Sequence, residues 1–309
     1  MKNIRPLILT AATGYRPEQL APFLESLKRT GFEGTVAILV DRKNTVLSDY
    51  LEQNGIEIIP VDMLPRWMPR WIAERRYNGG RMKWVRLAMA VFAKCLPPRW
   101  RYRYVARIVA PFHHLVVCRH FYFLDYLRAN GKRFSHVLFS DSRDVAFQAN
   151  PFENIPDRFL WLFQENNRVK IRDEYSNRSW VVSAYGTAGL ERIGSYGILC
   201  AGNSLGSVDL FTRYLQKMTD EMVRLTPIIA GNYGPDQAVH NYLYWTGRFP
   251  YAEVKQNFET VATLYLTDAS EFRFDEAGRL LDQEGSPVPV LHQYDRHPAL
   301  VAKVMARLA

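Results

Sequence analysis

Two aspartates, Asp141 and Asp144, directly follow the apolar run at residues 136–139, where a buried strand would end. Acidic and hydroxyl side chains in this position often cap a turn. Paired carboxylates also bind hard divalent cations such as Mg²⁺ or Mn²⁺, which prefer oxygen ligands. The spacing alone leaves a capped turn and a metal site as open alternatives.

A late histidine supplies a third ligand for the metal hypothesis. His292 directly follows another apolar run, at residues 288–291. Ligands of parallel α/β sheets lie beyond the carboxyl ends of the strands, so we expect His292 and the aspartates at one sheet edge. Two aspartates and one histidine suit Mn²⁺, and His297 is the second-choice ligand.

The elements that would position these residues follow an α/β order. Apolar runs at 6–11, 35–40 and 56–61 predict strands, with helices between them that end at Gly31 and Gly55. This alternation predicts a mostly parallel sheet flanked by helices, and we expect a single sheet. Later expectations are a helix over 111–130, a strand over 195–206 that runs into a glycine-rich turn, helices from Ser207, Pro235 and Pro298, and a last strand at 288–291.

The composition is that of an ordinary globular chain. Its 309 residues are enough for one sizeable core. The first residues lack the cleavage site of a signal peptide, and no run approaches the ~18 to 20 apolar residues that span a bilayer. Three distant cysteines match neither a disulfide framework nor a CxxC zinc site. These features favour a cytoplasmic, reducing location.

Residues 65–104 carry most of the excess positive charge. They hold nine arginines and two lysines against one acidic residue, Glu74, and four of the seven tryptophans. Basic residues interleaved with tryptophan suit an anionic membrane surface or another polyanion. The alternative is a solvated basic face with partly buried tryptophans. No nucleic-acid-binding motif accompanies the charge, so nucleic acid is the least favoured partner.

The aspartate motif resembles a known family. An apolar strand followed by DSRDVAFQANPF, at 141–152, is similar to the DxD-containing motif of GT-A fold glycosyltransferases, and to a group of them that carries DSRDV-x-FQ-x-x-PF. Four further segments resemble that group in the same order. They are the helix around Cys118-Arg119, the GILCAGN strand and turn at 197–203 on the acceptor side, the Gly-Pro-Asp-Gln motif at 234–237 and the HQYDRH segment at 292–297. The resemblance spans roughly residues 5–298 but not the basic segment, and its spacing is D-x-x-D instead of D-x-D.

The resemblance implies one GT-A-like catalytic domain over 1–309, with a Rossmann-like nucleotide-binding half, an acceptor-side half and 65–104 as a basic, tryptophan-rich insertion. It also implies a nucleotide-diphosphate-sugar donor and a Mn²⁺ or Mg²⁺ ion. Asp236 is the expected general base of an inverting enzyme, or it positions sugar hydroxyls in a retaining one. The other assignments are metal ligands Asp144, His292 and Asp141; donor nucleotide contacts Thr10, Ala12, Arg16, Asp41, Arg119 and Asp141; and acceptor contacts Asn203 and Gln237.

Each polar assignment has a structural alternative. Asp41 could cap a turn, Arg119 could be a helix-surface charge, and Asp236 could complement the helix dipole. Asn203 and Gln237 could be caps. Whether Asp141 binds the metal or only the nucleotide is also open.

The expected function is a metal-dependent glycosyltransferase of the hexosyltransferase type, acting on a hydroxyl acceptor such as a lipid-linked or cell-envelope glycan at the inner membrane face. A sugar nucleotidyltransferase is one alternative, but the first turn, at residues 11–16, has a single glycine where such enzymes carry a glycine-rich phosphate loop. A non-catalytic module that binds membranes or polyanions through its basic segment is the other.

Overall fold

The first third of the chain alternates strand and helix, as its apolar runs predict. A computed structural model describes residues 5–77 and 81–308. Gly31 and Gly55 follow the first two helices with φ values of +72° and +69°, a left-handed conformation that glycine adopts without strain. The elements are β1 (Pro6–Ala11), α1 (Pro17–Arg29), β2 (Thr35–Asp41), α2 (Thr45–Gln53) and β3 (Glu57–Val61).

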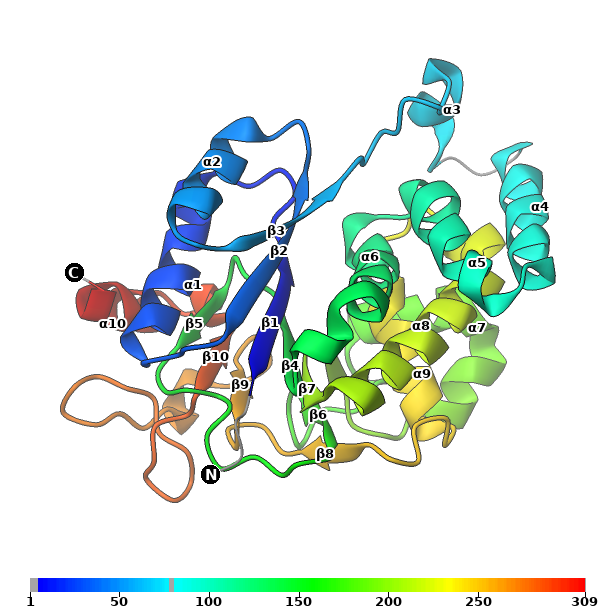
Figure 1. Cartoon of the computed structure of the whole chain (residues 1–309). Helices are drawn as coiled ribbons and strands as arrows, with labels where there is room; N and C mark the ends of the chain where they lie inside the picture. The colour runs from blue at the N-terminus through cyan, green and yellow to red at the C-terminus, as the bar shows by residue number, and fades with distance from the viewer. Residues whose placement is uncertain (1–4, 78–80, 309) are drawn as a thin grey trace.

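A seven-stranded sheet forms the centre of the molecule (Figure 1). Its order is β3-β2-β1-β4-β7-β6-β8, and every neighbouring pair is parallel except the two that involve β7. The mostly parallel sheet flanked by helices is therefore confirmed. The strands not yet bounded are β4 (His136–Ser140), β6 (Leu160–Gln164), β7 (Leu199–Ser207) and β8 (Glu253–Lys255).

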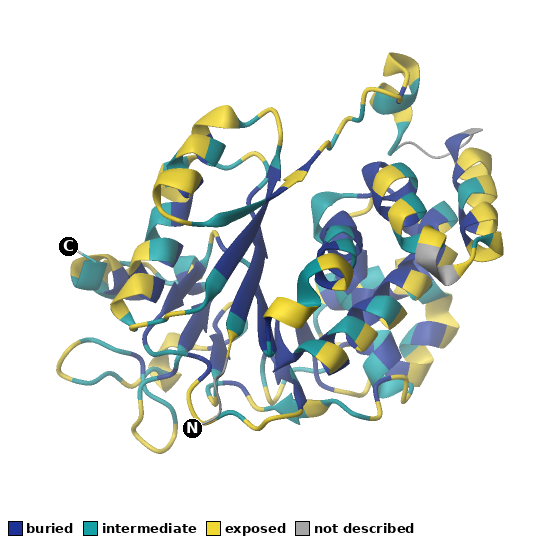
Figure 2. Ribbon diagram, viewed as in Figure 1, coloured by how far each residue is buried: buried dark blue, intermediate teal, exposed yellow. Residues whose placement is uncertain are grey.

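Both faces of this sheet are buried, because alternate side chains of each strand enter different cores. Figure 2 shows the central strands as mostly buried. Leu7 and Leu9 of β1 belong to one core, whereas Ile8 packs into the other. Helices α1 and α2 cover the second core, and a larger group covers the first. Strands buried on both faces have continuous apolar runs, which is why 6–11 and 35–40 are so uniformly hydrophobic. The larger group is α6 (Leu115–Asn130), α7 (Tyr175–Ile193), α8 (Val208–Ile229) and α9 (Pro235–Trp245).

A second, three-stranded sheet lies beside the first, so the expectation of a single sheet is wrong. Its order is β5-β10-β9, and β10 runs antiparallel to β5. The expected strand at 288–291 is part of this small sheet and not of the central one. The bounds are β5 (Val145–Phe147), β9 (Val261–Thr263) and β10 (Val290–His292), and the chain ends with α10 (Pro298–Leu308).

The glycine-rich stretch after residue 199 is strand, not the expected turn. All nine residues of β7 are buried, and the glycines let neighbouring groups approach closely. A Cβ on Gly206 would lie 2.7 Å from the carbonyl oxygen of Phe159. Glycine inside a strand often marks such an approach. The following helix, α8, packs an apolar face inward, since its Phe211, Leu215, Met218 and Met222 are fully buried.

The helix expected over 111–130 begins later, at Leu115. A π-helical turn (Val105–Val109) and a 3₁₀ turn (Ala110–Phe112) precede it, and His113 is extended, with φ −110° and ψ 154°. Pro111 lies in that 3₁₀ turn and has no N–H to donate, which suits a break in the helical ladder.

The basic segment forms three helices between β3 and α6. Residues 78–80 of this segment lie outside the described residues. Helix α4 packs against α8, so it extends the helical layer on one side of the sheet (Figure 1). Among the described residues, no helix is long and apolar enough to cross a membrane. The three helices are α3 (Arg70–Arg75), α4 (Arg81–Cys95) and α5 (Pro98–Tyr104).

Candidate metal centre and adjoining cavity

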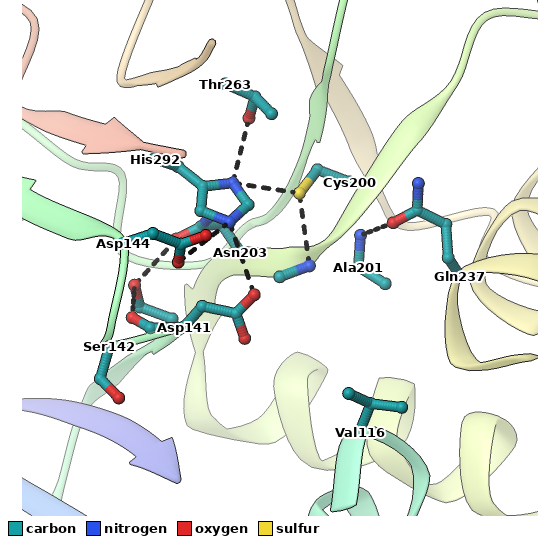
Figure 3. Close-up of polar contacts among 12 residues, drawn as sticks. Val116, Asp141, Ser142, Asp144, Cys200, Ala201, Asn203, Gln237, Thr263 and His292 are labelled. Carbon is teal, nitrogen blue, oxygen red and sulfur yellow. Dashed lines mark hydrogen bonds and ion pairs between the residues drawn. The ribbon is translucent and has the colours of Figure 1, made fainter. Parts of the chain in front are cut away.

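The turn that carries the two aspartates is held by its neighbours in the sheet. The backbone N–H of Asp141 donates to the carbonyl of Gly202 at 2.8 Å, and the Ser142 hydroxyl donates to the carbonyl of Ala11 at 3.1 Å. Strands β1 and β7 thus fix the turn from both sides. The carboxylates of Asp141 and Asp144 project from it toward the same space (Figure 3).

His292 meets both aspartates, as the sequence predicts. It pairs with Val145 in the β5–β10 ladder, so it lies beside Asp144. Its Nε2 is 3.4 Å from Asp141 Oδ2 and 3.9 Å from Asp144 Oδ1. One ligand atom from each of the three side chains lies within 4.8 Å of the others. The three predicted metal ligands therefore form one cluster.

The imidazole is oriented by contacts on its far side. His292 Nδ1 lies 3.5 Å from both Cys200 Sγ and Thr263 Oγ1. No hydrogen bond satisfies Nε2, although the ring is buried. A partner at one ring nitrogen that leaves the other facing a ligand site is typical of metal-binding histidines.

Close packing around the cluster requires a glycine on β7. A Cβ at Gly202 would lie 2.6 Å from Asp141 Oδ2 and 3.0 Å from His292 Cε1. Any side chain at this position would therefore displace the cluster. Gly202 is thus a residue of the site, which the motif GILCAGN contains without indicating its purpose.

Arg119 joins this cluster to a third carboxylate. Its Nη1 forms an ion pair with Asp141 Oδ1, and its Nη2 lies 3.3 Å from Asp236 Oδ2. Its Nε donates to the carbonyl of Val116 at 3.2 Å. The side chain is only 7% exposed, so a helix-surface charge is excluded. With three of its donors engaged, Arg119 acts first as a brace between two carboxylates.

The three carboxyl groups differ in their affinity for protons. Burial alone would raise the pKa of Asp141, but Arg119 and His292 outweigh it and hold that pKa well below its usual range. Burial raises the pKa of Asp236 to about 6, against the opposing charge of Arg119. Burial also raises the pKa of Asp144. Asp236 is therefore the carboxyl group best suited to exchange a proton near neutral pH.

The charge of the cluster bears on cation binding. Burial lowers the pKa of His292, but Cys200 and the neighbouring carboxylates outweigh it and raise that pKa well above its ordinary value. A bound cation would take the place of this proton between the carboxylates, because metal ligation requires a neutral imidazole. Two carboxylates and one imidazole are a suitable set for Mn²⁺ or Mg²⁺.

A cavity of about 350 Å³ adjoins the cluster. It falls within the size range of small-molecule sites, and residues from α6, α7, β7, α9 and the turn after β10 line it. Five of the residues assigned from sequence contribute to its wall: Arg119, Asp141, Asp236, Gln237 and His292.

The two residues assigned to the acceptor lie in different surroundings. Gln237 lines the cavity, but its amide is fully engaged. Its Oε1 accepts from Ala201 N at 3.1 Å, and its Nε2 donates to Glu165 at 2.7 Å and to Asn177 at 2.9 Å. Asn203 is fully buried beneath the aspartate turn, outside the cavity lining, and accepts from the Ser140 hydroxyl at 2.9 Å. The Gln237 amide therefore braces the site, whereas the Asn203 Nδ2 has no hydrogen-bond partner among the described residues.

Of the residues assigned to the donor nucleotide, Arg119 and Asp141 line the cavity, whereas Thr10, Ala12, Arg16 and Asp41 lie at or just after the carboxyl ends of β1 and β2, outside its lining. Thr10 and Ala12 are fully buried and Arg16 is exposed. Asp41 accepts from the backbone N–H of Lys43 at 3.1 Å, which is the turn-capping role left open by the sequence. This edge still adjoins the cluster. Tyr15 lies in the turn after β1; burial raises its pKa, and the negative charges of Asp141 and Asp144 raise that pKa further. His297, the second-choice ligand, lies outside the cluster, with its Nε2 2.8 Å from the Leu264 carbonyl.

The sequence motifs miss much of the cavity wall. Glu165 is buried and follows β6 directly, so the signal that marks Asp141, an acidic residue after an apolar run, would have found it. Burial raises its pKa. The aromatic residues come from segments without a recognisable motif. The lining residues outside the quoted motifs are Val116, Glu165, Glu174, Ser176, Asn177, Trp180, Tyr233 and Tyr265, and those inside a motif but without an assigned role are Cys200, Ala201, Gly202, Gly234, Gln293 and Arg296.

Comparison with protein-family models finds no match to this chain, and comparison with curated proteins finds no significant relative.

Replacing Arg119 is expected to destabilise the fold strongly. Arg119→Met leaves Asp236 buried without its cation, and removal of one partner of a buried ion pair costs about 3–5 kcal/mol. The exposed pair Arg158–Asp209 is the control, since Arg158→Met should cost less than ~1 kcal/mol. Urea unfolding at neutral pH measures both. Equal losses would show that Arg119 does not brace the site.

Proposed function

We propose that this protein is a metal-dependent glycosyltransferase with a GT-A-type fold, which transfers a hexose from a nucleotide-diphosphate sugar to a hydroxyl acceptor. The observation that carries the proposal is the cluster of Asp141, Asp144 and His292 at the edge of a cavity that also contains Asp236. The mostly parallel sheet, with its strand ends at this edge, supports it.

Asp144, His292 and Asp141 would hold the Mn²⁺ or Mg²⁺ ion. The unsatisfied Nε2 of His292, aimed at the two carboxylates, is the feature that fits a cation. Asp144 has no cationic partner as close as that of Asp141, since Arg296 Nη2 lies 3.9 Å away. When bound, the ion would offset the negative charge that develops on the leaving diphosphate.

The chain's own residues would do the remaining chemistry. In an inverting transfer, Asp236 takes the proton of the acceptor hydroxyl. The acceptor oxygen bonds to the anomeric carbon as the bond from that carbon to the β-phosphate oxygen breaks, and the nucleoside diphosphate leaves with the electron pair. Arg296 lines the cavity with its side chain 46% exposed, so it is the cation best placed to contact the phosphates.

Donor and acceptor would bind on opposite sides of the cluster. The loop after β1 and the end of β2, with Thr10, Ala12, Arg16 and Asp41, would surround the nucleoside. On the other side, Trp180, Tyr233 and Glu165 line the cavity. Aromatic walls with a few polar groups are typical of sites that orient a small polar ligand, so this half would receive the acceptor.

A sugar nucleotidyltransferase is the second candidate enzyme class. It would use the same sheet edge and a metal ion, but release diphosphate instead of a nucleoside diphosphate. The turn between β1 and α1 contains one glycine, Gly14, which does not favour a phosphate-cradling loop. Identifying the leaving group separates the two classes, and a non-catalytic module would release neither.

Loss of a metal ligand is expected to abolish donor binding. With Mn²⁺ and a panel of nucleotide sugars, Asp144→Ala and His292→Ala should each weaken nucleoside-diphosphate affinity by about 100-fold or more. His297→Ala, which removes a nearby histidine outside the cluster, should leave the affinity unchanged. Isothermal titration and donor hydrolysis measure the effects. The proposal fails if no donor binds the wild type and Asp144→Ala alters neither metal nor nucleotide affinity.

The pH dependence of transfer tests Asp236. A base must be ionised, so activity at saturating Mn²⁺ should fall as the pH drops through about 6, the raised pKa of this carboxyl. Asp236→Asn should lose about 10²–10⁴-fold in rate, and its residual rate should lack this acidic limb. Metal affinity measured over the same pH range shows whether the loss of activity at low pH comes from Asp236 or from protonation of the metal ligands. An Asn variant with full activity would remove Asp236 from the chemistry.

A further inference from the structure

Helix α4 is apolar on two opposite faces. One face packs inward and buries Met82, Ala90 and Ala93, together with the guanidinium of Arg86. The opposite face is exposed, and its residues recur at the helical spacing that places them on one side. An apolar face of this extent on a surface helix is typical of a binding surface. The exposed apolar side chains are Trp84, Val85, Leu87, Val91 and Phe92.

Three more exposed tryptophans lie on the neighbouring segments of the same basic stretch. Trp67, Trp71 and Trp100 are 45%, 58% and 54% exposed, and Trp84 is 72% exposed. The alternative of partly buried tryptophans on a solvated basic face therefore does not hold for these side chains. More than half of the exposed large apolar residues in the described chain lie within 64–100. We call the outward residues of α4, with Trp67, Trp71 and Trp100, the tryptophan face.

The charge around the tryptophan face selects its partner. Lys83 and Lys94 lie on α4 beside the apolar stripe and are exposed, and so are Arg66 and Arg75 of the preceding segment. The exposed Arg70 forms an ion pair with Glu74 at 2.9 Å. The segment holds a single acidic residue, Glu74. Cations bordering exposed tryptophans match a bilayer interface, where the rings enter the headgroup region and the cations meet anionic lipid. An apolar protein partner would not require this charge.

The segment that carries the tryptophan face packs, through its inner side, beside the rim of the cavity. The Tyr77 hydroxyl contacts the carbonyl of His113 at 3.3 Å, and the ring of His114 packs edge-on against Tyr233 at 5.3 Å between ring centres. Tyr233 lines the cavity. Arg86 of α4 also donates to the carbonyl of Ala230 at 3.3 Å. These contacts attach the basic segment to the loop that carries one wall of the cavity.

We infer that the tryptophan face binds the surface of an anionic lipid bilayer. Binding is peripheral: the tryptophan and phenylalanine rings insert among the headgroups, and the lysines and arginines pair with anionic lipid. This association is independent of the proposed transfer reaction. A second consequence rests on the proposed function: the acceptor is a hydroxyl on a lipid-anchored glycan, presented to the cavity from the membrane.

Vesicle co-sedimentation of the full chain tests the association. Wild-type protein should bind vesicles of phosphatidylcholine with phosphatidylglycerol, bind phosphatidylcholine alone far less, and lose binding as salt is added. Trp84→Ser combined with Phe92→Ser should lower the vesicle partition coefficient by ~tenfold or more. The matched control combines Val46→Ser with Met305→Ser, two exposed apolar residues on other helices. It should bind as the wild type does.

A charge-reversal pair separates the electrostatic contribution. Lys83→Glu with Lys94→Glu should weaken binding to anionic vesicles and flatten its salt dependence. Lys28→Glu with Lys132→Glu makes the same change in net charge at exposed positions elsewhere and should have little effect. Circular dichroism confirms that the variants are folded, which exposed substitutions should permit.

Two vesicle results overturn the inference: no vesicle binding by the wild type, or equal binding to neutral and anionic vesicles at low salt. A third result also overturns it, namely a wild-type dimer that does not bind vesicles and that dissociates in the Trp84→Ser, Phe92→Ser variant. Donor hydrolysis in solution distinguishes failure of the membrane association from failure of the proposed transferase function. It should be unchanged in this variant, whereas transfer to an acceptor in vesicles should fall. If the protein binds vesicles but no preparation hydrolyses a nucleotide-sugar donor, the proposed function is wrong and the membrane association is still supported.

Discussion

The buried guanidinium of Arg119 is the interaction on which the site depends. It forms ion pairs with Asp141, just after β4, and with Asp236, at the start of α9. One side chain from α6 therefore links the end of a strand to the beginning of a helix. A carboxylate as buried as Asp236 needs a cationic partner, because an unpaired charge in a low-dielectric interior is strongly destabilising. Arg119 lowers the pKa of both carboxyl groups, but the net shifts have opposite signs. The pKa of Asp141 is lowered, while burial still raises that of Asp236.

A short strand pair completes the cluster. Strand β5 begins directly after Asp144 and pairs with β10 in a register that sets His292 opposite Val145. A slip of one residue would turn His292 to the other face of this ladder. Gly202 on β7 leaves room for the ring and for the Asp141 carboxylate. The cluster therefore depends on two sheets meeting at one corner, with the central sheet supplying the aspartate turn and the small sheet supplying the imidazole.

The inner side of the basic segment, residues 65–104, packs next to the cavity wall. Arg86 and Tyr77 contact the loops around 230 and 113, next to the cavity wall, while the tryptophan face points outward. A protein that needed the segment only as a brace would be expected to place polar residues on that outer side. The exposed aromatic rings and cations of the segment instead suit the surface of a lipid bilayer. The segment would therefore hold the proposed active site close to a membrane that presents the acceptor.

The sequence by itself determined the strands and helices with strong periodicity, and with them the parallel half of the sheet. Strands such as 6–11 are buried on both faces, so their apolar runs are unambiguous. It also indicated Asp141, Asp144, His292 and Asp236, because acidic and imidazole groups at element ends stand out against apolar neighbours. Tertiary structure alone decided that β10 leaves the central sheet, that 199–207 is strand, that the Gln237 amide is engaged within the fold, that Asn203 lies outside the cavity, and that Trp180 and Tyr233 line it. These outcomes depend on which distant segments pack together, and local patterns in a chain do not contain that information.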